Sequence, residues 1–297
     1  MLQRDWLIAG FAWVGLFLPV FAQDTVALKW EFEKGKPFYQ EWTTETKQTM
    51  KVMGKDITQN QKQTFIFSYR PKDQDKDKNW IVTQKIEDAD TGNPNPPAGF
   101  LKALVGSEFE LTISPKLTIL TIKGREDFVS RLVKANPQME LLLKQLLSED
   151  AMKQMAETIF AAVPEKPVKN GDAWEKKSSS NMGPIGGYDT TSKYTYEGKD
   201  DKLHKIKVET AVRYHPPEAK ADGDLPFKIK AARLESKGGN GIVLFDNEKH
   251  RLENSELNLR LEGEFTLDIS GQTTTVNLTQ DQTTTIKMSD QNPAVKK

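Results

Sequence analysis

Apolar and polar residues alternate along most of the chain after residue 23, and this period of two predicts β-strands. The clearest row is 257–269, where Leu257, Leu259 and Leu261 open a strict alternation with polar neighbours. Residues 38–52 and 57–69 flank a Gly-Lys-Asp turn and read as a hairpin. About fourteen strands are expected in all, with turns at 236–241 and at 280–281 among their connections. Tight connections of this kind predict an antiparallel sheet.

One segment, 125–170, departs from this period and predicts three helices. A first helix carries an apolar stripe from Phe128 to Val133. A second is expected to begin at Pro137, with Asn136 as its cap, and a third is expected to be capped by Ser148. The 3.6-residue period of the third continues to Pro164, where a helix must stop. Strand-like sequence therefore lies on both sides of a helical centre.

The expected fold is α+β, with a large curved antiparallel sheet or sheets covered by the central three-helix segment. Its divisions are a signal peptide at 1–22, an N-terminal β half at 23–124, the helices at 125–170, a C-terminal β half at 171–289 and a disordered tail at 290–297. The halves share two features: a Gly-containing turn opens a strand at 35–38 and at 171–174, and 109–121 resembles 242–255. A duplication and the ordinary likeness of short strands both remain open.

The N-terminus has the pattern of a secretory signal. Arg4 precedes an apolar run, and Val20-Phe21-Ala22 offers small residues at the positions that a signal peptidase reads. We expect cleavage near Ala22 and export to the periplasm or the extracellular space. The alternative is a retained membrane anchor, for which the run is short. No later stretch is apolar enough to span a membrane as a helix.

Composition narrows the chemistry. Lys plus Arg and Asp plus Glu are both 42, so no net field attracts nucleic acid. Cysteine is absent, which excludes disulfides and thiolate catalysis. The three histidines, His204, His215 and His250, have no metal-ligand spacing, and no hydrolase or phosphate-loop motif occurs. We therefore expect no enzyme activity, no cofactor and no metal site.

A resemblance is carried by two stretches. Residues 164–174 read Pro-Glu-Lys-Pro-Val-Lys-Asn-Gly-Asp-Ala-Trp, and 108–116 read Glu-Phe-Glu-Leu-Thr-Ile-Ser-Pro-Lys. With the signal peptide and the helical insert, they resemble an uncharacterised family of exported bacterial β-rich proteins. The Pro-Val-x-x-Gly-Asp-x-Trp motif is structural in character, because it leaves a helix and starts a strand. The resemblance implies export and fold, and no catalytic residue.

Binding is the remaining function class. A curved sheet with helices over its concave face can enclose a hydrophobic or lipid-like ligand, and the alternative is a closed core in a structural or protein-interaction module. A hydrophobic small molecule or an envelope protein is the partner expected in the two cases. The candidate apolar lining is Trp42, Phe65, Phe67, Leu142, Leu146, Met152, Met155 and Phe160, and Trp30, Phe38 and Trp80 extend it.

Overall fold

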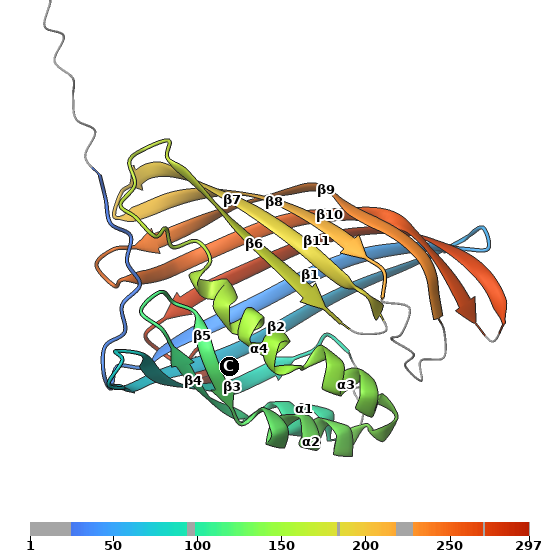
Figure 1. Ribbon diagram of the computed structural model, residues 1–297, viewed down its shortest axis with the longest axis horizontal. Helices are drawn as coiled ribbons and strands as arrows, with labels where there is room; N and C mark the ends of the chain where they lie inside the picture. Colours follow the sequence, from blue (N-terminus) through green and yellow to red (C-terminus); the bar gives the residue numbers. More distant parts are fainter. Residues whose placement is uncertain (1–24, 94–98, 183–184, 218–227, 270, 297) are drawn as a thin grey trace, which may run out of the picture.

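A single antiparallel sheet of eleven strands forms the framework of the protein (Figure 1). The computed structural model describes residues 25–93, 99–182, 185–217, 228–269 and 271–296, so the expected signal peptide lies outside the described residues. The N-terminal half supplies β1 (Phe38–Val52), β2 (Lys55–Gln74), β3 (Trp80–Asp90), β4 (Glu108–Ile113) and β5 (Ile119–Lys123). The C-terminal half supplies β6 (Ala173–Asn181), β7 (Gly187–Asp200), β8 (Leu203–His215), β9 (Lys228–Asp246), β10 (Arg251–Ile269) and β11 (Gln272–Ser289).

The strand order is β5-β4-β3-β2-β1-β11-β10-β9-β8-β7-β6, so the two halves join where β1 pairs with β11. Each half crosses the sheet in the same direction. In this order β1 is the first strand of its half and β6 is the first strand of the other. The β4–β5 and β9–β10 pairs, which resemble each other in sequence, are the fourth and fifth strands of their halves. A duplication would require this arrangement, although the duplication itself stays a prediction.

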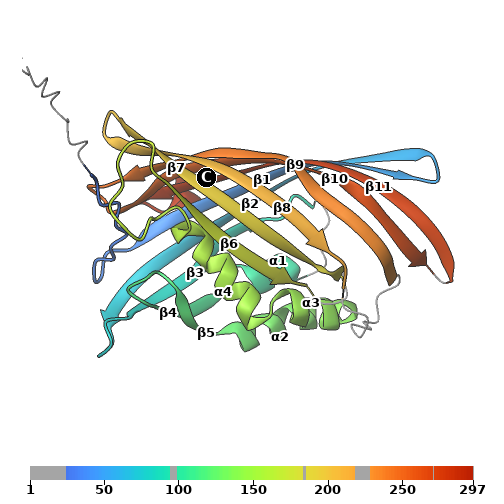
Figure 2. The ribbon, with the colours of Figure 1, turned by 45° about the horizontal axis from the view of Figure 1, so that its top comes forward.

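The helical segment lies on the concave side of the arched sheet (Figures 1 and 2). It contains α2 (Arg125–Ala135), η1 (Pro137–Met139), α3 (Glu140–Leu146), α4 (Glu149–Glu157) and η2 (Thr158–Phe160). A further short helix, α1 (Phe100–Leu104), was not expected. Ser148 caps α4 as predicted, because its Oγ accepts from the backbone N–H of Ala151 at 3.3 Å. Asn136 makes no such bond, and the turn that follows it is a 3-10 helix.

Helix α4 lies between the two edge strands of the sheet, β5 and β6 (Figure 1). On one side, the backbone N–H of Ile119 in β5 donates to Glu157 Oε1 at 2.7 Å. On the other, Gln154 Nε2 donates to the carbonyl oxygen of Ser179 in β6 at 3.0 Å. Exposed edges invite pairing with other chains, and these bonds cover part of both. The helix therefore bridges the opening of the curled sheet.

Two predicted turns are wrong, and they account for two of the three strands by which the eleven among the described residues fall short of the expected fourteen. Residues 236–241 run inside β9, and Gln280 and Asp281 run inside β11. Two of the three glycines in β9 serve close packing instead of a turn. A Cβ on Gly239 would lie 2.1 Å from the carbonyl oxygen of Thr210, and one on Gly241 would lie 2.2 Å from that of Glu256. Glycine lets neighbouring strands approach where the sheet bends.

Apolar and polar residues also alternate at 28–32, but this segment forms no strand, which accounts for the third missing one. Leu28, Trp30 and Phe32 are buried, and the residues between them are exposed. Trp30 packs edge-on against Phe160, with ring centroids 4.8 Å apart. Alternation reports which side is buried, whereas a strand also needs a continuous hydrogen-bonding partner. Here the backbone contacts are isolated: a bridge joins Val26 to Val168, and the Glu31 N–H donates to the carbonyl oxygen of His250 at 3.0 Å. At the other end, the tail expected to be disordered contains a 3-10 helix, η4 (Pro293–Lys296).

The main apolar core lies between the helices and the sheet and includes residues from both halves of the chain. A second, smaller cluster around Tyr214, Leu234 and Leu261 lies on the C-terminal strands. An antiparallel curled sheet with a few helices is thus confirmed. No described helix is long and apolar enough to cross a membrane.

Candidate functional site: a cavity between helix α4 and the sheet

A cavity of about 1170 Å³ lies between the helical segment and the concave face of the sheet. One wall comes from α4, η2 and the loop to Pro164, and it includes Met155 and Phe160. The opposite wall is built by strands β1 and β6 to β11. Such a volume is slightly larger than the roughly 300–1,000 Å³ of typical small-molecule sites. The helices therefore do not fill the whole concave face.

The apolar floor of the cavity follows from strand register. Trp42 of β1 pairs with Ile286 of β11, and both line the cavity. In the next row, Leu257 of β10 and Val208 of β8 both pair with Gly241 of β9. Side chains on one face of a sheet repeat every second residue, so these rows face the same way. The floor is completed by Tyr194, Val243 and Leu252.

The eight residues predicted to line a ligand site divide into two groups. Trp42, Leu146, Met155 and Phe160 line the cavity. Met152 lies instead in the main core, where 7% of it is exposed, whereas 43% of Met155 is exposed. The helix thus closes a core with one side and borders a void with the other.

The remaining three predicted residues lie outside the cavity lining. Phe65 and Phe67 of β2 stack on each other at 6.1 Å and pack against the main core. Leu142 of α3 is half-buried. The helical segment packs on the β3–β5 side of the sheet, and for this reason the N-terminal half is filled where the C-terminal half is hollow. The three additional candidates also differ: Trp30 lines the cavity, and Phe38 and Trp80 do not.

Sequence reasoning missed the contribution of the C-terminal strands. Tyr194, Val208, Val243, Leu257 and Ile286 line the cavity, and none was among the candidates. Their alternation was visible in the sequence. It marks a buried face, but it does not tell whether a helix or a void covers that face.

Polar groups line one side of the cavity. Thr190 and Ser192 of β7 and Thr210 of β8 present hydroxyls there, and Ser192 Oγ lies 2.9 Å from Thr210 Oγ1. Burial raises the pKa of the Tyr194 phenol, which is neutral at physiological pH, and a hydrogen bond from Ser192 partly opposes this shift. The charged residues of the lining are four lysines and four glutamates, so they cancel.

The histidines have separate structural surroundings. His204 Nδ1 lies 2.8 Å from the Tyr196 hydroxyl, and burial lowers the pKa of His204. The ring of His215 stacks beside Tyr214, and His250 faces Glu31 at 3.8 Å. Among the described residues, no group of three or more His, Cys, Asp or Glu side chains is arranged to hold a metal ion.

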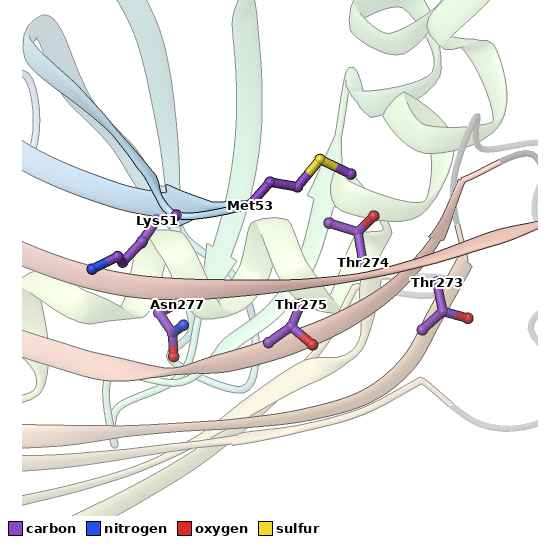
Figure 3. Close-up of a pocket in the computed structure, with 7 residues that line it drawn as sticks. Lys51, Met53, Thr273, Thr274, Thr275 and Asn277 are labelled. Carbon is purple, nitrogen blue, oxygen red and sulfur yellow. The ribbon is translucent and has the colours of Figure 1, made fainter.

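A second hollow, of about 340 Å³, lies where the tip of the β1–β2 hairpin meets the start of β11 (Figure 3). Lys51, Met53 and Asn277 line it together with the threonines at 273–275. It is an exposed depression between hairpin ends, without a cluster of convergent chemical groups.

One of three comparisons with known proteins assigns the chain to a family. No curated protein matches the sequence. A solved structure described as "Lipid-protein interactions in lipovitellin" aligns with 87% of this chain at 11% identity and a TM-score of 0.48, and the alignment spans 25% of that chain. A family model matches residues 68–293. The chain belongs to this family, the family of unknown function DUF6263.

Proposed function

We propose that this protein is an exported, non-enzymatic binding protein that holds a hydrophobic or lipid-like ligand between α4 and the concave face of the sheet. The observation that carries the proposal is the cavity of about 1170 Å³ with its apolar floor. Removing apolar ligand surface from water yields about 25 cal/mol per Å², so a chain laid along Trp42, Leu257 and Ile286 would be held without any charged contact.

The signal-like N-terminus supports export. The protein would carry its ligand outside the cytoplasm, where a free hydrophobic molecule is insoluble. The cavity supplies a sheltered volume, and its polar side supplies contact with water. Because the function of DUF6263 is unknown, membership of this family gives no evidence for or against an activity.

Native mass spectrometry of the protein purified from its own host tests the proposal. Leu257→Glu would place a carboxylate on the cavity floor, and Asn258→Glu is the matched control because Asn258 is exposed on the other face of β10. We expect a copurifying ligand on the wild type and on the control, and loss of that ligand from Leu257→Glu. Absence of a ligand from all three proteins, with no uptake of added lipid after purification, would contradict the proposal.

A protein-interaction module is the second candidate, and exposed apolar residues at the hairpin ends favour it. Met53 and Ile57 at the β1–β2 end are 78% and 47% exposed, and Ile269 at the β10–β11 end is 45% exposed. Met53→Ser and Ile57→Ser would abolish capture of an envelope protein in this case, without any change in bound ligand.

A further inference from the structure

We infer that the ligand is an amphipathic molecule whose head is uncharged and hydrogen-bonding, such as a hydroxyl-bearing monoacylglycerol. This inference rests on the proposed function and adds the chemical class of the ligand. It follows from the way the lining changes from apolar to polar along neighbouring strands, from hydroxyl donors without a partner, and from the pairing of both lining lysines of β6 with glutamates.

The lining changes character within one step along the strands. On β7, Ser192 comes two residues before Tyr194 and lies on the same face. On β8, which runs in the opposite direction, Thr210 comes two residues after Val208. Tyr194 pairs with Val208 and Ser192 pairs with Thr210, so both strands change at the same level of the sheet. All four residues line the cavity. A ligand lying along the strands would meet apolar side chains at one end and hydroxyls at the other.

Several of these hydroxyls have hydrogens to donate. Ser192 and Thr210 share one hydrogen bond, and Ser192 also hydrogen-bonds to the Tyr194 phenol, so the free donors are sought at the other two threonines. Thr284 accepts a bond from Gln282 at 3.2 Å and keeps its own hydrogen. Thr190 forms no hydrogen bond through its side chain within the described part of the chain. Partly buried hydroxyls of this kind gain free energy when a ligand supplies an acceptor.

The charged residues of the lining do not fit an ionic head group. Lys176 pairs with Glu165 at 3.5 Å, and Lys177 pairs with Glu175 at 3.2 Å. Glu157 is held by the backbone N–H of β5. The other two lysines of the lining, at 29 and 116, are exposed at its margin. A carboxylate or phosphate head buried at the hydroxyls of β7 and β8 would have to break a β6 ion pair or stay unpaired, and burying an unpaired charge is costly.

Four probes with the same twelve-carbon chain test this inference in full-length mature protein. They are 1-monolauroylglycerol, laurate, dodecyl phosphate and dodecyltrimethylammonium, each titrated calorimetrically below its micelle concentration. We expect the monoacylglycerol to bind about tenfold more tightly than each charged probe. Tighter binding of any charged probe, or equal binding of all four, would overturn the inference and leave the proposed function standing. Binding of none, and no uptake of dodecane, would overturn both.

Matched variants locate the head. Thr284→Val and Thr210→Val remove a hydroxyl with little change of shape, and each should weaken monolauroylglycerol binding about fivefold without changing dodecane uptake. Thr285→Val is the control, because it lies one residue along β11 on the opposite face. Circular dichroism establishes that each variant is folded. Unchanged affinity in both folded cavity variants would contradict the assignment of the head to this side.

Discussion

Two methionines on helix α4 should respond differently to the same substitution. Met152 is 7% exposed and belongs to the main core, whereas Met155 is 43% exposed and lines the cavity. Both lie in the same nine-residue helix, so Met152→Ala and Met155→Ala change helix propensity equally. The difference between them therefore measures packing.

The expected magnitudes follow from burial. Truncating a methionine in a filled core costs about 2–5 kcal/mol, because contacts are lost and a new void remains. For Met152→Ala we expect about 3 kcal/mol. For Met155→Ala we expect about 1 kcal/mol or less, since roughly half of the side chain is already exposed and the space beside it is already empty.

Urea unfolding, monitored by tryptophan fluorescence, measures the loss of unfolding free energy in both variants. The comparison is valid where the slope of the unfolding free energy against urea concentration is unchanged. A ligand-uptake assay should show the reverse order, with Met155→Ala the weaker binder. Equal losses of about 3 kcal/mol would mean that α4 closes a filled core on both sides, and the reasoning about the cavity would be refuted.

Three other outcomes follow from local geometry. Gly263→Ala would place a Cβ 1.9 Å from a backbone oxygen of β9, so it should cost several kcal/mol of unfolding free energy. Gly238→Ala is the control, because a Cβ there meets open space, and it should cost less than about 1 kcal/mol. Equal costs would contradict the explanation that glycine lets the strands approach. Ser148→Ala should cost about 0.5–1 kcal/mol in urea unfolding through loss of the α4 cap, and no loss would show that the cap is dispensable. Asp290 accepts a hydrogen bond from the buried Arg251, and this bond lowers the pKa of the Asp290 carboxyl. The ionised carboxylate therefore stabilises the fold above the ordinary Asp pKa of 3.8, and the stabilisation is lost as the pH falls through the depressed folded-state pKa. Asp290→Asn should therefore lower the thermal midpoint at pH 6, with a deficit that shrinks as the pH falls below 3.8, and a deficit that does not shrink would contradict this linkage.

Much of the fold is readable from local pattern. The alternation at 257–269 became β10, and the Ser148 cap became the start of α4. The family resemblance is confirmed by the match over 68–293. What failed depends on long-range geometry: the glycines at 238–241 look like a turn until the neighbouring strands are known, and α1 is too short, at five residues, to show a helical period.

The candidate site was only half predictable for a related reason. A residue such as Leu257 shows the same alternation whether a helix or a void covers it. Met152 and Met155 likewise share one sequence stripe, and only the placement of α4 between β5 and β6 separates them. The chemistry of each side chain is encoded locally, but the space in front of it is set by elements far away in the chain.

The central claim is that the space between α4 and the concave face receives a hydrophobic ligand. The most direct measurement is the anomalous scattering from crystals of the protein with a terminally brominated alkyl chain. We predict bromine peaks among Trp42, Leu257, Ile286 and Met155. Bromine peaks confined to the outer face or the hairpin ends, or none in the presence of excess ligand, would contradict it.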